Sequence, residues 1–324
     1  MPKAIRFAKT GGPEVLSWEE VEVGPPGPGE AQVRHKAVGV NFVDTYNRSG
    51  LYKHPLPSGL GAEGAGVVEA VGAGVTNVKA GDRVAYGTGP LGAYAEMRNM
   101  PADKLCILPE KISFEQGASM MLQGMTVQYL IKRTYPVKAG ETVLWHAAAG
   151  GVGQIAVQWL KALGVTVIGT AGSDDKCALA KSLGADHVIN YKTENFVERV
   201  LAITGGAKVP VVYDSVGKDT WIGSLDCLRT RGTMVSFGNA SGAVTGVDLG
   251  ILSAKGSLYL TRPTLASYAG TRADLEATSK DLFDVVLSGK VKIDISKTYA
   301  LKDAAQAHGD LESRTTTGSL ILVP

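Results

Sequence analysis

A glycine-rich turn near the middle of the chain carries the clearest chemical signal. It runs from His146 to Gly153 as HAAAGGVG, an AxGxxG pattern with Ala148 in place of the first glycine. Small residues let the backbone approach a pyrophosphate, and the N-terminus of a following helix attracts the anion. The turn follows the apolar segment TVLWH and precedes the amphipathic segment QIAVQWLKALG, so it should connect a strand to a helix. This context predicts a dinucleotide site rather than a glycine-rich turn without a ligand.

A second group of residues follows the next predicted strand, VTVIGT, where such a domain holds the adenosine ribose. NAD-selective domains place a carboxylate there, whereas this loop begins with Gly172 and Ser173 and continues to Lys176. A hydroxyl and a cation suit a 2′-phosphate, which favours NADPH. Asp174 and Asp175 weigh against it unless they point to solvent at the helix start. An ordinary solvated lysine is the alternative for Lys176.

The hydrophobic pattern indicates which elements position these residues. From Glu141 onward, apolar strands alternate with amphipathic helices through six strands and end at SLYLTR, which predicts a doubly wound parallel sheet. From Met1 to about Pro109, short strands separated by glycine and proline predict a β-rich, barrel-like domain. Apolar residues at helical spacing after Ser113 predict a linking helix.

The segment beyond Pro263 is too short to fold alone. Helices are expected around Arg272 to Leu287 and around Leu301 to Leu311, followed by a closing strand, GSLILVP. We expect this tail to pack onto the first domain.

Composition narrows the class of protein. A chain of 324 residues with 44% hydrophobic and 20% charged residues predicts two globular domains. The net charge of +2, without a long basic run, makes nucleic acid an unexpected partner. The start, MPKAIRFAKT, lacks a signal-peptide pattern, and no apolar run approaches the roughly 20 residues of a membrane span, so the cytoplasm is expected. Three cysteines without a CxxC pair fit reduced thiols.

Metal ligands are missing from the expected places. Zinc-dependent alcohol dehydrogenases of similar layout take ligands from a cysteine near residue 40 and from a Gly-His-Glu segment. Here the first position is Asn41, and the second segment reads GAEGAG, with Ala62 in place of histidine. The five histidines are scattered without ligand spacing, so no zinc site is expected.

Several longer segments together resemble one family. They are VGVNFVDTYNRSGLY from Val38, AAAGGVG, VINY ending at Tyr191, VVYDSVGKDTW from Val211, SFGNASGAVTG from Ser236, LTRP around Arg262 and LESRTTTGS from Leu311. Their order and spacing along the whole chain resemble the quinone oxidoreductases, the zinc-free, NADPH-using branch of the medium-chain dehydrogenase/reductase superfamily that includes zeta-crystallin.

The resemblance implies an α/β fold in which a GroES-like catalytic domain comes from residues 1–122 and 264–324. A Rossmann NADPH-binding domain would occupy residues 123–263. A homodimer, formed through the edges of the Rossmann sheets, is also implied. The residues that the resemblance places around the cofactor are Asn41, Thr126, Gly150, Gly151, Val152, Ser173, Lys176, Tyr191, Ser215, Phe237, Gly238, Asn239, Arg262 and Arg314.

The implied activity is NADPH-dependent reduction of a small-molecule quinone. Without a zinc Lewis acid, the acceptor must already be electrophilic, as quinones are. Asn41 and Tyr52, together with Tyr46, would orient the quinone oxygen, and no single general acid would be indispensable. The particular quinone, and whether electrons leave singly or as a hydride, stay open.

Other interpretations of the same residues stand beside this one. Reduction of a 2-alkenal or enone double bond is an alternative activity, and a crystallin-like structural or RNA-binding role is an alternative of another class. Tyr46 and Tyr52 could be packing aromatics, and Phe237 could belong to the core. Arg262, before Pro263 at a strand end, could form a surface ion pair.

Overall fold

The computed structural model describes residues 1–313 and 316–324 and divides into two compact units. The first unit comprises Met1–Met125, Tyr268–Leu287 and Ile293–Pro324. The second comprises Thr126–Ser267 and Ser288–Lys292. Among the described residues, no helix has an apolar stretch long enough to cross a membrane.

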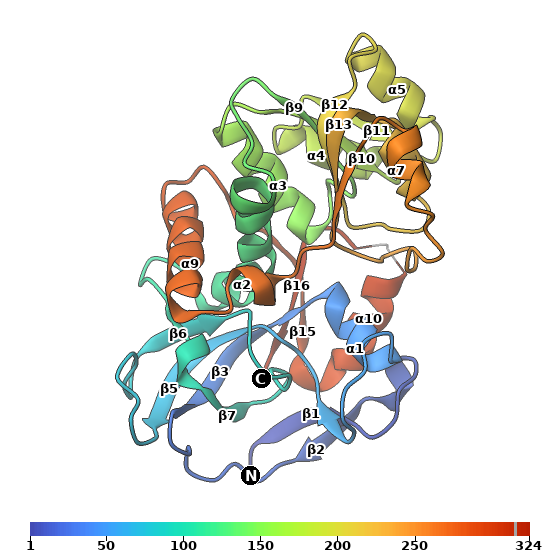
Figure 1. The fold of residues 1–324 in the computed structure, drawn as a ribbon. Helices are drawn as coiled ribbons and strands as arrows, with labels where there is room; N and C mark the ends of the chain where they lie inside the picture. Colours follow the sequence, from blue (N-terminus) through green and yellow to red (C-terminus); the bar gives the residue numbers. More distant parts are fainter. Residues whose placement is uncertain (314–315) are drawn as a thin grey trace. The chain divides into compact units, whose positions relative to one another are not determined.

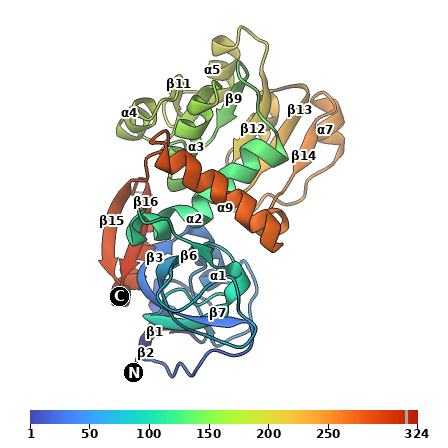
Figure 2. The same cartoon turned by 90° about the vertical axis from the view of Figure 1, so that its left-hand side faces the viewer.

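The second unit is built on a six-stranded sheet in which neighbouring strands run parallel. Its strands are β9 (Thr142–Trp145), β10 (Thr166–Ala171), β11 (His187–Asn190), β12 (Val209–Asp214), β13 (Leu228–Ser236) and β14 (Tyr259–Thr261). The spatial order β11-β10-β9-β12-β13-β14 is that of a doubly wound dinucleotide-binding sheet. Figure 2 shows β12, β13 and β14 following one another across it. The prediction of six strands in a parallel sheet is confirmed.

Helices connect these strands, and Figure 1 shows α3, α4 and α5 beside the sheet. They are α3 (Gly151–Ala162), α4 (Asp174–Ser182), α5 (Phe196–Ile203), α6 (Trp221–Asp226) and α7 (Gly250–Ala254). The central strand β12 is buried at every residue, because a strand covered on both faces must be apolar on both sides. The linking helix α2 (Phe114–Tyr129) continues into a π-helical segment, Leu130–Thr134.

The first unit contains a seven-stranded, mostly antiparallel sheet and a smaller three-stranded sheet. The larger sheet holds β3 (Glu30–Val40), β5 (Gly64–Val71), β6 (Arg83–Tyr86), β7 (Met97–Pro101), β8 (Cys106–Ile107), β15 (Ile295–Ala300) and β16 (Ser319–Val323). The smaller sheet holds β1 (Lys3–Phe7), β2 (Ser17–Glu20) and β4 (Ser58–Gly59). Strand β16 pairs with β3, with Leu320 opposite Val40.

The core of the first unit joins side chains from both ends of the chain, including Val33, Leu60, Tyr86 and Leu322. Its other helices are α1 (Phe42–Ser49), α9 (Arg272–Leu287) and α10 (Ala304–Glu312), and the short helix α8 (Leu265–Tyr268) spans the point in the sequence where the second unit gives way to the first. Helix α10 contacts α1 (Figure 1). The predicted fold class, a Rossmann-type sheet with a GroES-like domain, is confirmed.

Two elements of the first unit were not predicted from the sequence. Strand β15 pairs in parallel with β16, and helix α1 interrupts the strands near the N-terminus. Helix α1 forms because the Asp44 carboxylate accepts the backbone N–H of Asn41, which satisfies a donor at the helix start. It ends at Gly50, whose φ of 85° suits glycine.

Candidate functional site

Asn41 lies between β3 and α1 and is 5% exposed. Its Nδ2 donates to Oε2 of Glu63 over 2.6 Å. Its Oδ1 accepts a hydrogen bond of 3.1 Å from Nε2 of Gln123. The backbone N–H of Asn41 donates to Oδ2 of Asp44 over 2.9 Å. These bonds hold Asn41 at three points and use one of its two Nδ2 hydrogens.

Glu63 is a carboxyl group with no exposed surface. While Oε2 faces Asn41, Oε1 accepts the backbone N–H of Leu122 over 2.8 Å. Burial raises the pKa of Glu63 to about 8, and the hydrogen bonds from Asn41 and the backbone act in the opposite direction. When Glu63 is ionised, its two oxygens therefore accept from two donors at once.

Gln123 extends the network to the C-terminal strand. Its Oε1 accepts a hydrogen bond from Oγ of Ser319 over 3.0 Å. The Ser319 hydroxyl also lies 3.2 Å from the carbonyl oxygen of Ser119. Ser319 is the first residue of β16, so the surroundings of Asn41 combine segments that are distant in the sequence.

A second buried chain of polar groups supports α1. The Tyr94 hydroxyl donates to Oδ2 of Asp44 and lies 3.0 Å from Nε2 of His308. Arg48 contacts Nδ1 of His308 over 2.9 Å and forms an ion pair of 2.6 Å with Glu312. Because Arg48 can only donate, His308 carries its proton on Nε2 and donates it to Tyr94. Burial raises the pKa of Asp44 to about 7 and lowers the pKa of His308 to about 3.

Tyr46 and Tyr52 lie together, close in sequence to Asn41. Their ring centroids are 5.4 Å apart, and the Tyr52 backbone N–H donates to the Tyr46 carbonyl over 3.1 Å. Tyr46 also contacts Phe42, at 6.0 Å between ring centroids. Tyr52 is 37% exposed. The two tyrosines therefore pack on each other while Tyr52 keeps surface open to a ligand.

In the second unit, the predicted phosphate turn connects β9 to α3. Gly150 precedes the helix, which begins at Gly151. The first turn of a helix leaves backbone N–H groups, including those of Gly151 and Val152, without intrahelical acceptors. A Cβ at Gly153 would lie 2.3 Å from the carbonyl oxygen of Ala147. A side chain at that position would force the turn to shift, and the free N–H groups of the turn suit a pyrophosphate.

A buried hydrogen-bond network joins the loops after β9 and β12, which are adjacent where the strand order reverses. Nε2 of His146 lies 3.0 Å from Oγ of Ser224, which donates to Oδ2 of Asp214 over 2.8 Å. Oδ1 of Asp214 accepts the backbone N–H of Val216 over 2.7 Å. Burial lowers the pKa of His146. The network holds the loop that contains Ser215 against the loop of the phosphate turn.

Phe237 and Gly238 lie in the loop after β13, and Arg262, which follows β14, contacts this loop. The Phe237 backbone N–H donates to the Asp214 carbonyl over 2.8 Å. A Cβ at Gly238 would lie 2.3 Å from the Ser215 carbonyl oxygen, so the two loops pack backbone to backbone. Arg262 donates to the Gly238 carbonyl over 2.9 Å. The guanidinium of Arg262 thus holds this loop, whereas the sequence left a surface ion pair as its alternative.

Other predicted residues in this part of the chain have less specific surroundings. Asn239 continues the loop, and its carbonyl accepts the backbone N–H of Gly242 over 2.9 Å. The half-buried Phe237 has its ring centroid 5.6 Å from that of Trp145. Thr126 lies in α2 and is 8% exposed. Arg314 lies outside the residues that the structure describes.

The residues predicted around the adenosine ribose gather after β10. Ser173 caps α4, and its Oγ accepts the Lys176 backbone N–H over 3.4 Å. A Cβ at Gly172 would lie 2.5 Å from the hydroxyl oxygen of Tyr191. Tyr191 is 41% exposed. A hydroxyl, a lysine and an exposed phenol therefore come from adjacent segments.

The two acidic residues at the start of α4 are both exposed. Oδ1 of Asp174 accepts a hydrogen bond of 2.7 Å from Nδ2 of Asn190, at the end of β11. Asp175 lies at the helix start, where negative charge is favourable.

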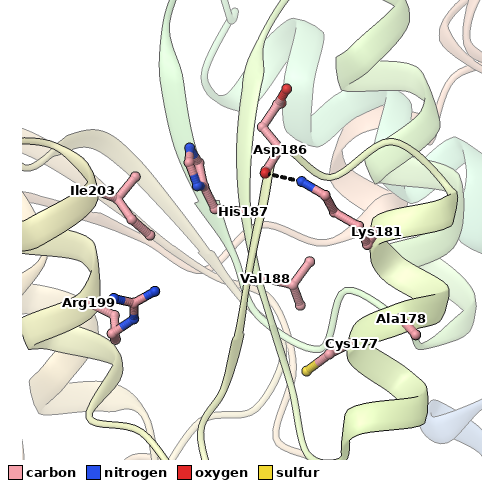
Figure 3. Close-up of a pocket in the computed structure, with 8 residues that line it drawn as sticks. All are labelled: Cys177, Ala178, Lys181, Asp186, His187, Val188, Arg199 and Ile203. Carbon is pink, nitrogen blue, oxygen red and sulfur yellow. Dashed lines mark hydrogen bonds between the residues drawn. The ribbon is translucent and has the colours of Figure 1, made fainter.

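A separate hollow of about 390 Å³ lies beside the edge strand β11 (Figure 3). It is lined by Cys177, Ala178, Lys181, Asp186, His187, Val188, Arg199 and Ile203. Lys181 donates to the Asp186 carbonyl, and Arg199 forms an ion pair of 2.8 Å with Glu194. The two long cationic side chains of this hollow are therefore already paired, and its lining contains no residue predicted to bind the cofactor.

The supporting residues Glu63, Gln123, Asp44, His146 and Asp214 were not predicted from the sequence as members of the site. A carboxyl group inside the otherwise uncharged segment GAEGAG was a usable signal for Glu63, because such a group is unusual in a buried strand unless it is hydrogen-bonded. No local pattern pairs it with Asn41.

Comparisons with known proteins agree with the architecture. Residues 27–110 match the family described as alcohol dehydrogenase GroES-like domain, and residues 151–284 match the family described as zinc-binding dehydrogenase. A quinone oxidoreductase of Pseudomonas aeruginosa is 58% identical over 325 residues, covering 100% of both chains. The chain belongs to the quinone oxidoreductase family. The resemblance inferred from the sequence segments is confirmed, and so is the enzyme class, oxidoreductase.

Two further relatives illustrate the range of the family. A crystal structure of Escherichia coli quinone oxidoreductase complexed with NADPH is 57% identical, covers 99% of this chain and 100% of its own, and has a TM-score of 0.98. A 2-haloacrylate reductase of a Burkholderia species is 48% identical over 335 residues, covering 100% of this chain and 99% of its own.

One matching family takes its name from zinc, but the residues at the two expected ligand positions of this chain do not fit that metal. The two ligand positions hold an amide, Asn41, and a methyl group, Ala62. Within residues 1–313 and 316–324, no group of three or more His, Cys, Asp or Glu side chains could hold a metal ion. A zinc site takes about three or four such ligands.

Proposed function

We propose that this protein reduces quinones with NADPH and needs no zinc. The observation that carries the proposal is Asn41, a buried amide oriented by Glu63 and Gln123, at a position where zinc-dependent dehydrogenases of similar layout have a metal ligand. An amide can hydrogen-bond an acceptor oxygen but cannot polarise an unactivated carbonyl as zinc does. Membership of the quinone oxidoreductase family, with a relative solved in complex with NADPH, supports the same substrate and cofactor.

The cofactor fits the loops at the carboxyl ends of β9, β10, β12 and β13. The backbone of Gly150, Gly151 and Val152 would hold the pyrophosphate at the start of α3. Ser173, Lys176 and Tyr191 would surround the 2′-phosphate. The residues proposed for the remaining cofactor contacts are Asn41, Thr126, Ser215, Phe237, Gly238, Asn239, Arg262 and Arg314.

The reaction is proposed to convert a quinone, NADPH and one proton into a hydroquinone and NADP⁺. Bound NADPH supplies two electrons and one hydrogen as a hydride. The remaining Nδ2 hydrogen of Asn41 and the hydroxyl of Tyr52 orient the quinone oxygen and stabilise its developing negative charge. The second proton comes from water, since the hydroquinone anion is resonance-stabilised.

The direct test follows the oxidation of NADPH and of NADH by absorbance, with a small quinone as acceptor and a metal chelator present. Quinone turnover that prefers NADPH and resists the chelator is expected. Loss of turnover on chelation, with recovery on adding zinc, would refute the zinc-free proposal.

Tyr52→Phe tests the proposed absence of an obligatory proton donor. We expect the variant to bind NADPH normally and to retain quinone turnover, because Asn41 still donates to the oxygen. Complete loss of turnover with intact NADPH binding would make Tyr52 an obligatory donor instead.

A second activity is supported by the 2-haloacrylate reductase relative. Its name points to an activated carbon–carbon double bond, and such an acceptor needs the same hydride and the same hydrogen bond to a carbonyl oxygen. A 2-alkenal offered in the NADPH assay distinguishes the two activities. Turnover of the alkenal alone would replace the quinone proposal, and absence of turnover with intact NADPH binding would favour a structural or RNA-binding role.

We further propose a homodimer formed along the edge of the second unit's sheet. Strand β14 is the last strand of that sheet, and its Tyr259 and Leu260 are 62% and 38% exposed. An exposed apolar edge strand is a template for pairing with another copy. Sedimentation of Leu260→Lys is expected to show a monomer, and an unchanged mass would refute this interface.

The three free cysteines fit a cytoplasmic setting.

A further inference from the structure

Four side chains, Asn41 among them, form a continuous chain of hydrogen bonds. Ser319 donates to Gln123, Gln123 donates to Asn41, and Asn41 donates to Glu63 over 2.6 Å. Amide side chains carry a donor and an acceptor of similar size, so the same chain could also run the opposite way. The direction of the chain decides what the Asn41 amide has left to offer a ligand: an Nδ2 hydrogen or an Oδ1 lone pair.

Glu63 is the group that selects the direction. Its Oε1 is occupied by the backbone N–H of Leu122, which can only donate. Its Oε2 is therefore the atom offered to Asn41. In the ionised form, which a pKa of about 8 places above that pH, this oxygen can only accept. At the far end, Ser319 is compatible with either direction, because its hydroxyl also lies 3.2 Å from the carbonyl oxygen of Ser119. A hydrogen-bond donor in place of Oε2 would reverse the direction of every hydrogen bond from Asn41 to Gln123.

We propose that Glu63 is a positioning residue that sets this direction, so that Asn41 presents its second Nδ2 hydrogen to the acceptor oxygen of the substrate. The proposal rests on the proposed function for the identity of that oxygen. Glu63 itself is fully buried and acts only through Asn41. The geometry also explains why a carboxyl group occupies the buried, otherwise uncharged segment before β5: an isosteric amide would offer the wrong polarity.

The informative variant is Glu63→Gln, which keeps the shape of the side chain. The Leu122 N–H would hold the glutamine oxygen, so the new amide nitrogen would face Asn41 and donate to it. Asn41 and Gln123 would then both rotate, and Ser319 would donate to the Ser119 carbonyl. Every buried group would keep a partner, while Asn41 would present a lone pair to the substrate oxygen.

The test compares the wild type, Glu63→Gln, Asn41→Asp and the double variant at about pH 9, where Glu63 of the wild type is ionised. For Glu63→Gln we expect a Tm within about 2 °C of the wild type and an NADPH Kd within about twofold. Its kcat/KM for a quinone should fall about tenfold or more.

Asn41→Asp should lower the Tm, because two carboxyl oxygens would face each other. The double variant should recover the Tm, because the amide introduced at position 63 donates to the carboxylate introduced at position 41. It should not recover kcat/KM, because that carboxylate has no hydrogen to offer the substrate.

A matched control is Glu141→Gln, which neutralises a carboxylate that accepts from Tyr135 and Lys138 near the start of β9. It should leave kcat/KM unchanged. Wild-type kcat/KM in Glu63→Gln would overturn the proposal, and so would a double variant no more stable than Asn41→Asp. If the wild type reduced no quinone, the proposed function would fail, while the Tm comparison would still decide the direction of the chain.

Discussion

Replacing Asp44 with asparagine should change how the stability of this protein depends on pH. Asp44 is fully buried, and its Oδ2 accepts from the Asn41 backbone and from the Tyr94 hydroxyl. Its Oδ1 is buried without a hydrogen-bond partner among the described residues. An asparagine oxygen at the position of Oδ2 would keep both bonds, so α1 should still form.

The magnitude follows from the pKa of Asp44, which burial raises from 3.8 to about 7. Well below pH 4 the carboxyl is neutral in both the folded and unfolded chain. Between pH 4 and 7 the unfolded chain releases the proton while the folded chain keeps it, so the free energy of unfolding falls as pH rises. A difference of about three pKa units corresponds to about 4 kcal/mol.

The asparagine of the Asp44→Asn variant would not titrate, so the variant would not show this fall in the free energy of unfolding. At low pH the neutral carboxyl and the amide both leave a donor near the position of Oδ1, so the variant should lie within about 1 kcal/mol of the wild type. Near pH 8 it should be more stable by about 2–4 kcal/mol, because it avoids ionising a buried group.

Urea denaturation of both proteins at pH 5 and pH 8 measures this difference. The advantage of the variant should grow by about 2–3 kcal/mol between these pH values, because the unfolded carboxyl is already ionised at pH 5. Asp294→Asn, at an exposed position, serves as the control for removing a carboxylate and should show the same difference from the wild type at both pH values. If the difference between Asp44→Asn and the wild type does not change between the two pH values, the assignment of a raised pKa to Asp44 is wrong.

Three further substitutions test the nucleotide-binding loops. Lys176→Ala should raise the KM for NADPH about tenfold or more and leave that for NADH within about twofold; equal losses for both cofactors would contradict a role at the 2′-phosphate. Gly153→Ala should lower the Tm and weaken NADPH binding, because its Cβ would lie 2.3 Å from the Ala147 carbonyl oxygen, whereas Gly24→Ala, with open space around the added Cβ, should do neither. Ser224→Ala should cost about 1–3 kcal/mol of stability and raise the NADPH Kd, measured by fluorescence titration; an unchanged Kd would show that the network does not support cofactor binding.

The doubly wound sheet was predictable because its signals are local. The strands β9, β10 and β12 are short, largely apolar runs, and amphipathic segments follow them in the sequence. The phosphate turn could be located for the same reason, since Gly150 to Gly153 lie within one turn. Residues of this kind act through their own backbone and immediate neighbours.

The first unit was less predictable from the same patterns. Helix α1 was missed because a glycine- and proline-punctuated region suggested only strands, although Asp44 three residues after Asn41 satisfies the helix start. Strand β15 was missed because its residues are mostly polar and exposed. Its place beside β16 is set by backbone pairing rather than by an apolar face.

The amino-acid sequence was sufficient for the family, the two types of fold, the phosphate turn and the replacement of two zinc ligands by Asn41 and Ala62. Only the tertiary structure assigned partners to Asn41: Glu63 comes from the segment before β5, Gln123 from α2, and Ser319, which bonds Gln123, from β16. Local patterns report the environment of a residue within a few positions, whereas hydrogen bonds across a folded unit depend on the distance between strands. The direction in which the Asn41 amide points is therefore a property of the assembled core.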